Sequence, residues 1–128
     1  MNPGLDLPHY SAPKNDNERL LNYQYDYKVH GDRRALNKIY ELGKEIAYKY
    51  INVYTCENKL FKQLSPEIRQ EKAHNAITYI VARYLKVNGW AIKKSFTSYI
   101  YLRVRHELLY RRKVDDIIDF VDLEEMRV

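Results

Sequence analysis

The stretch SFTSYIYLRVRHELLYRRK, from Ser95 to Lys113, carries two patterns that decide how the chain folds. On a helix, which turns about 100° per residue, one side of this stretch is apolar, with Phe96 at its N-terminal edge. The apolar side consists of Ile100, Val104 and Leu108. A second side gathers rings and hydrogen-bond donors, and consists of Tyr99, Arg103, His106 and Tyr110. The first side predicts a helix packed on a core and capped by Ser95, and the second suits the holding of unstacked bases and phosphates.

A first helix is predicted near the N-terminus, from Glu18 to about Lys28. Either Asp16 or Asn17 can cap it, and Gly31 ends it by allowing a left-handed turn. Residues 1–15 hold three of the four prolines and show no periodicity, so we expect an extended or disordered arm.

Two longer helices are predicted in the middle of the chain, because apolar residues recur at steps of three and four. The first begins at Arg33 and ends near Tyr54, and its stripe is Leu36, Ile39, Tyr40, Gly43, Ile46, Ala47, Tyr50 and Tyr54. The second begins at the capping sequence Ser65-Pro66-Glu67 and ends near Lys86. Its stripe is Ala73, Ile77, Ile80, Val81 and Tyr84. Residues 55–64 are expected to form a loop or a frayed turn.

The prediction is therefore an all-α fold, a compact bundle of about four helices in one domain from residue 16 to 113. The single cysteine, Cys56, excludes an internal disulfide framework and is typical of a reducing compartment. No signal peptide or membrane-spanning run is recognisable, so we expect a cytoplasmic protein without membrane contact.

Charge is distributed unevenly along the chain. Residues 1–114 hold 21 Lys and Arg against 11 Asp and Glu, whereas residues 115–128 hold six acids and one arginine. The basic part favours a polyanion, although a merely solvated basic face is the alternative. The segment 114–128 alternates acids with apolar residues and is expected to dock. One hypothesis is that it folds back on the basic helix and suppresses DNA binding.

The sequence lacks the usual signatures of an enzyme or a metal site. There is no glycine-rich phosphate loop, cysteine pair or HExxH motif, and the four histidines do not have metal-ligand spacing. His106 has only Glu107 beside it, which projects in another direction. We therefore expect no catalytic activity, no metal and no cofactor.

Three motifs occur in the order found in bacterial RNA polymerase sigma factors. FTSYIYLRVRHELL, from Phe96, resembles the F-S-T-Y-A-x-x-R-I-R-x-x-I/L pattern of sigma region 2.3 to 2.4. EIRQE, from Glu67, resembles D-L-I-Q-E of region 2.2, and HGDRRALNKIYELGKEIAYKYI, from His30, resembles the opening of region 2. Lys72 stands where the family has glycine, and nothing after Lys113 resembles region 4. The resemblance, which spans about Gly31 to Lys113, implies a helical sigma region 2 of compact alternative or phage type.

The resemblance also implies partners and residue roles. One helix would bind the clamp coiled coil of the largest subunit of bacterial core RNA polymerase, through Ile68, Gln70, Glu71 and His74. The next would capture the non-template strand of promoter DNA, with Phe96, Ser98 and Tyr99 at melting positions and His106 helping to choose the minus-ten sequence. Arg103 and Arg105 match an R-x-R of alternative sigma factors. The expected DNA-binding set also includes Trp90, Lys93, Lys94, Tyr110, Arg111, Arg112 and Lys113.

Other interpretations stay open from the sequence. Trp90 either plugs the helix junction or presents its ring to a ligand. A second protein would supply minus-35 recognition, and an anti-sigma factor is a further expected partner. The alternatives to a sigma-like factor are a generic helical DNA- or RNA-binding protein, and a phage structural or interaction protein without polymerase binding.

Overall fold

The computed structural model describes residues 7–57, 64–87 and 90–109. Within these ranges the secondary structure is helical, without strands, and confirms the all-α prediction. The elements are α1 (Asp16–His30), α2 (Arg33–Glu57), α3 (Pro66–Ile80), the π-helical turn η2 (Val81–Leu85) and α4 (Phe96–Leu109). The third predicted helix, expected to run unbroken to about Lys86, thus changes its hydrogen-bonding pattern after Ile80.

Local capping sets the helix ends, with one correction to the sequence analysis. The cap of α1 is Asn15, whose side chain accepts a hydrogen bond from the Glu18 N–H at 2.9 Å, and not Asp16 or Asn17. Gly31 ends α1 with a φ of 66°, as predicted. Ser65 accepts from the Ile68 N–H at 3.2 Å and caps α3, also as predicted.

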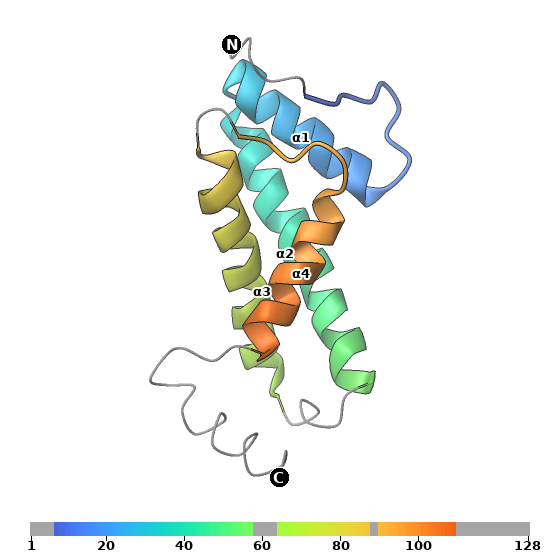
Figure 1. Cartoon of the computed structure of the whole chain (residues 1–128), viewed down its shortest axis with the longest axis vertical. Helices are drawn as coiled ribbons and strands as arrows, with labels where there is room; N and C mark the ends of the chain where they lie inside the picture. Colours follow the sequence, from blue (N-terminus) through green and yellow to red (C-terminus); the bar gives the residue numbers. More distant parts are fainter. Residues whose placement is uncertain (1–6, 58–63, 88–89, 110–128) are drawn as a thin grey trace.

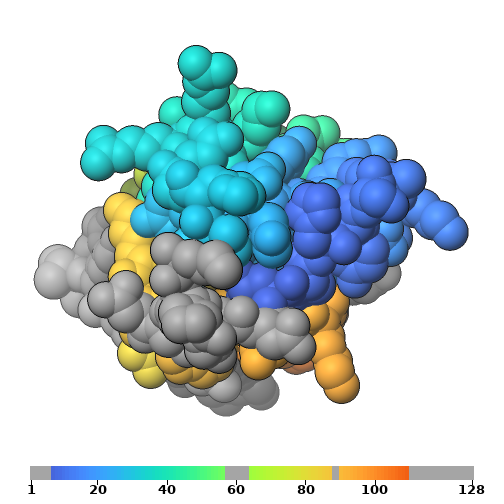
Figure 2. All heavy atoms as spheres, turned by 90° about the horizontal axis from the view of Figure 1, so that it is seen from above, coloured from blue at the N-terminus to red at the C-terminus, as the bar shows by residue number. Residues whose placement is uncertain are grey.

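The bundle is arranged around α2, which packs against α1, α3 and α4. Figure 1 shows α4 crossing in front of α2, with α3 beside both and α1 at the end where residues 90–95 pass. Seen from that end, the start of α2 lies at the top of the view, the residues around η2 at the left and the segment from residue 90 toward the bottom (Figure 2). The Tyr84 and Tyr99 rings, 5.0 Å apart, show that η2 and the first turn of α4 share one side of the molecule.

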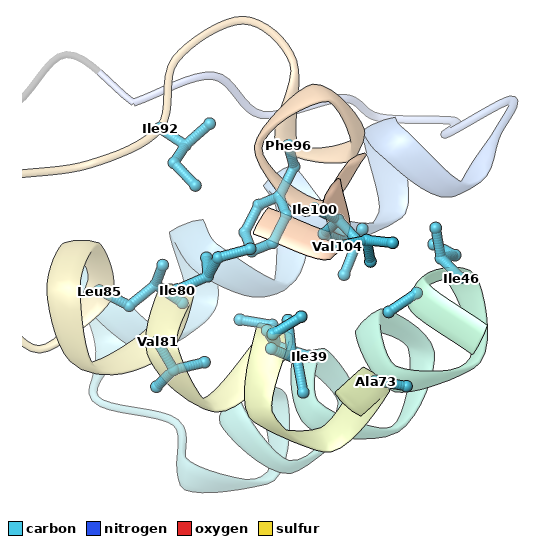
Figure 3. Packing of buried hydrophobic residues seen from close by; sticks show 14 of the residues in the cluster. Ile39, Ile46, Ala73, Ile80, Val81, Leu85, Ile92, Phe96, Ile100 and Val104 are labelled. Carbon is cyan, nitrogen blue, oxygen red and sulfur yellow. The ribbon is translucent and has the colours of Figure 1, made fainter. Parts of the chain in front are cut away.

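One core joins all four helices and the segment before α4. Ile39, Ile77, Ile80, Ile92 and Phe96 are each at most 1% exposed and belong to one cluster (Figure 3). Burying side chains of this size stabilises the fold by about 1.5 to 3 kcal/mol each. The predicted apolar side of α4 is confirmed, since its three aliphatic residues are also buried.

Gly43 marks the closest approach of α2 and α3. A methyl group added at Gly43 would overlap the end of the Ile77 side chain, and would lie 2.7 Å from Ile77 Cγ1. The absence of a side chain at this position lets the two helices pack at short range.

The described part of the N-terminal arm, residues 7–15, lacks regular structure but contacts the bundle. The Tyr10 N–H donates to Asn22 Oδ1 at 2.7 Å, and the Asn22 amide donates back to the Tyr10 carbonyl at 2.8 Å. The His9 and Tyr25 rings are 4.7 Å apart. This piece of the arm is therefore fastened to α1. Among the described helices, none has the length and apolar character needed to cross a membrane.

Candidate nucleic-acid interface

The start of α4 is fixed by a side chain from the other end of the sequence. Asn17 Oδ1 accepts hydrogen bonds from the N–H groups of Phe96 at 2.6 Å and Thr97 at 3.2 Å. The Asn17 amide donates to the Lys94 carbonyl at 3.2 Å, while Ser95 Oγ accepts from the Ser98 N–H at 3.2 Å. Ser95 is therefore a cap, as predicted, and the free N–H groups of the first turn already have acceptors.

The segment before α4 is held by α1. Gln24 is fully buried, and its amide pairs with the backbone of Ile92, donating to the carbonyl at 2.7 Å and accepting from the N–H at 2.8 Å. Lys28 Nζ donates to the Val87 carbonyl at 2.9 Å, and burial lowers the pKa of Lys28 below its ordinary value of 10.5. These contacts fasten the backbone on both sides of Trp90.

Three rings from different elements meet beside this segment. The Tyr84 ring of η2 lies 5.0 Å from the Tyr99 ring of α4 in an edge-on arrangement, and 5.2 Å from the Trp90 ring. Tyr84 and Tyr99 are half-buried, whereas Trp90 is 46% exposed. We call Tyr84, Trp90 and Tyr99 the ring cluster. Trp90 thus packs on Tyr84 at the helix junction and leaves part of its ring in solvent, while its contact with a ligand stays a prediction.

The wider turn of η2 helps to bring Tyr84 to this position. The Lys86 N–H donates to the Val81 carbonyl at 3.0 Å, five residues earlier, which is the π-helical pattern. One extra residue in the turn rotates the rest of the helix relative to a regular α-helix, and such turns are frequent at functional sites. Tyr84 packs against the core, as its place in the predicted stripe required, and it also has a surface side that the helical pattern did not predict.

Exposed positive side chains flank Tyr84 and Trp90 along the sequence. Arg83 and Lys86 are exposed on and after η2, and Lys93 and Lys94 are exposed before α4. Rings flanked by exposed cations can stack bases while holding phosphates. Arg83 and Lys86 were not in the predicted DNA-binding set. Arg83 follows Tyr79 by four residues and Lys86 follows Arg83 by three, so this helical spacing could have identified them.

Arg103 does not present a free charge to this surface. Its guanidinium stacks on the Tyr79 ring, 3.6 Å from the centroid, and forms an ion pair with Glu107 at 2.8 Å. The Arg103 and Glu107 side chains are only 11% and 12% exposed. Arg103 therefore supports Tyr79, which is 39% exposed, and the predicted direct role of Arg103 in DNA contact does not fit this geometry.

Phe96 requires a second correction. It is fully buried, and Figure 3 shows its ring pointing from the start of α4 into the core. The apolar edge predicted from the helical pattern is confirmed, and the full burial of Phe96 leaves no exposed ring for the DNA contact that the family resemblance implies. A ring that fills the core cannot receive a base without unfolding the end of the bundle.

The remaining predicted DNA-binding residues lie in different places. Ser98 is exposed and bonded to Ser95 Oγ at 2.7 Å, and His106 is half-buried. Arg105 is exposed but lies over the Tyr101 ring, 6.0 Å from its centroid, away from the ring cluster. The others lie outside the described residues, namely Tyr110, Arg111, Arg112 and Lys113. The acidic segment 114–128 lies outside them as well.

The predicted polymerase-binding residues form a separate surface on α3. Gln70, Glu71 and His74 are exposed and Ile68 is half-buried; we call these four residues the α3 outer face. Gln70 and Tyr48 line a hollow of about 360 Å³ toward α2, on a different side of α3 from Tyr79. A partner on the α3 outer face and a ligand on the ring cluster would therefore not compete for the same residues.

Lys72, which departs from the family pattern, lies inside the bundle. It is 6% exposed, and its ammonium donates to the Glu107 carbonyl at 3.3 Å, near the C-terminal end of α4. A cation at that end satisfies a carbonyl and the negative end of the helix dipole. Lys72 therefore joins α3 to α4.

No family model, curated protein or solved structure matches the chain. The site must therefore be interpreted from its own chemistry. Within residues 7–57, 64–87 and 90–109, no three His, Cys, Asp or Glu side chains are grouped so that they could hold a metal ion.

Proposed function

We propose that the chain is a sigma-like transcription initiation factor. It binds bacterial core RNA polymerase through the α3 outer face, and it captures the non-template strand of a minus-ten-type element through the ring cluster. The observation that carries the proposal is the ring cluster itself, with exposed Trp90 beside half-buried Tyr84 and Tyr99. Unpaired bases stack on such rings, whereas the surrounding cations contact phosphates without selecting sequence.

The order of the three sigma-like motifs favours polymerase as the partner over unassisted DNA binding. Glu71 and Gln70 have the family's docking residue types and are both exposed on α3. Because the two surfaces use different residues, one molecule can hold polymerase and a displaced strand together. This is what promoter opening requires of a sigma factor.

The first experiment is capture of bacterial core RNA polymerase by the tagged chain at physiological salt. Glu71→Lys should abolish capture without unfolding, because Glu71 is exposed. Asn37→Lys adds a positive charge at an exposed position on α2 that does not line the hollow beside Gln70, and this variant should capture polymerase normally. Equal capture by both variants would remove the docking assignment.

The second experiment measures binding of the polymerase complex to single-stranded minus-ten DNA. Trp90→Ala should weaken binding by about 1 to 3 kcal/mol, the range for one base stacked on a ring. Tyr101→Ala, on another side of α4 and 41% exposed, is the matched control and should bind as wild type. Tyr99→Ala should also lose DNA while retaining polymerase; loss of both would indicate that Tyr99 serves the fold.

A generic nucleic-acid-binding protein is the second candidate, favoured by the exposed cations around the ring cluster. It would bind duplex DNA or RNA without polymerase, with affinity that falls steeply as salt rises. In that case Glu71→Lys would leave nucleic-acid binding intact, and wild type would capture no polymerase.

A further inference from the structure

A second exposed apolar area lies where α2 and α4 cross. Val53 is 56% exposed, Tyr101 41% and Leu102 60%. The Tyr50 and Tyr101 rings meet edge-on at 5.4 Å and join the two helices, while the exposed Arg105 lies beside Tyr101. We call Tyr50, Val53, Tyr101, Leu102 and Arg105 the α2–α4 surface.

This surface borders the ring cluster only at Leu102, which follows Tyr99 by three residues on α4. Tyr101 lies about 200° around α4 from Tyr99, so a ligand stacked on Tyr99 would not cover Tyr101. Adjacent apolar side chains exposed to this degree, with a cation at their border, are typical of an interaction surface. The function proposed above uses none of these residues.

The chemistry of the α2–α4 surface fits an apolar segment that carries acids. Exposed Lys49, which forms an ion pair with Glu45 at 3.5 Å, lines a hollow together with Tyr50, so both helices supply a cation near the rings. Residues 115–128 hold six acids and one arginine, and the same segment contains five large apolar residues. These are Ile117, Ile118, Phe120, Val121 and Leu123. The charges are therefore opposite, and both sides offer apolar groups to bury.

The length of the chain also fits. From Leu109 back to Leu102 along α4 is about 10 Å, at 1.5 Å per residue. Seven residues after Leu109 can span up to about 23 Å when extended, so residues from Ile117 onward can reach Leu102.

We propose that the α2–α4 surface is the docking site of the chain's own C-terminal segment, residues 114–128. The segment covers Leu102 and Tyr101 with its apolar residues and places its acids near Arg105 and Lys49. Docked there, it leaves the ring cluster open. This differs from the hypothesis that the segment folds back on the ring-bearing side of α4 and suppresses DNA binding.

Cysteine pairs in the full-length chain test the location. Exposed Cys56 is first replaced by serine, and Val121→Cys is then combined with Val53→Cys, Arg83→Cys or Arg34→Cys; Val53 is used because Leu102 borders Tyr99. The Arg83 position probes the surroundings of the ring cluster, and Arg34, at the start of α2, lies about 24 Å along the helix from Tyr50. All three positions are exposed, so the replacements should not disturb folding.

The expected result under mild oxidation is an intramolecular disulfide that forms at least about tenfold faster with Val53→Cys than with Arg34→Cys, because docking raises the effective concentration. Faster closure with Arg83→Cys would overturn the proposal and place the segment on the ring-bearing side. Equal rates at the three positions, or disulfides only between two molecules, would also overturn it.

Discussion

Replacing Gly43 with alanine, the residue with the highest helix propensity, should destabilise the protein. In an exposed helix, alanine in place of glycine stabilises by about 1 kcal/mol. At Gly43 the added methyl would lie 2.7 Å from Ile77 Cγ1, and Ile77 is fully buried in the core. Either Ile77 leaves its rotamer or α2 and α3 move apart, and overpacking of this kind costs about 1 to 3 kcal/mol.

Combining the two effects, Gly43→Ala should lower the free energy of unfolding by about 1 kcal/mol, whereas the same replacement in an exposed helix would raise it by about 1 kcal/mol. Urea unfolding followed by far-ultraviolet circular dichroism measures it. Asn37→Ala is the control, because Asn37 is exposed on the same helix, and it should stabilise by about 0.5 kcal/mol.

A double variant isolates the contact. Ile77→Ala alone should cost about 2 to 5 kcal/mol. In its background the new methyl at position 43 would meet only the Cβ of residue 77, at an ordinary 3.6 Å. Gly43→Ala should therefore stabilise the Ile77→Ala protein and destabilise wild type. A stabilising effect in both backgrounds would refute the close approach of the helices.

Three further outcomes are expected. Gln24→Leu should destabilise by about 2 to 4 kcal/mol in urea unfolding, because both backbone groups of Ile92 lose their partner; a neutral result would show that they are satisfied otherwise. Asn17→Ala should lower stability by about 1 to 2 kcal/mol in thermal unfolding, while Asn17→Asp, which still accepts from the start of α4, should lose less. Burial lowers the pKa of Lys28, so the folded state binds fewer protons just below pH 10.5, and the stability of wild type relative to Lys28→Met should rise as pH rises through that window. A fall over the same window would contradict the burial of this amine.

The helices and most of their caps follow from short-range pattern. The caps at Ser65 and Ser95 and the left-handed turn at Gly31 involve partners at most five residues away, so a single stretch of chain reveals them. Where several possible capping residues are adjacent, the pattern alone does not show which one caps the helix. Asn15, Asp16 and Asn17 are adjacent and all are good caps, and the one that caps α1 is Asn15.

The resemblance to a known family was informative about residue types and less so about their exposure. It drew attention to Tyr99, whose ring packs on Tyr84, but it also placed Phe96 and Arg103 in the DNA-binding set. Helical periodicity alone had placed Phe96 at the core edge, where it lies. The engagement of Arg103 with Tyr79 depends on how α3 and α4 pack, which the pattern of α4 alone does not contain.

Local periodicity thus made this chain an all-α bundle with one apolar side per helix, because each backbone hydrogen bond in a helix closes within a few residues. The candidate site has another origin. Asn17 caps a helix 79 residues away, and Gln24 holds a backbone 68 residues away. Tyr84, Trp90 and Tyr99 become neighbours only when α3 and α4 pack side by side. Contacts between distant segments form when the core closes, so their partners are decided by packing and not by any one stretch of sequence.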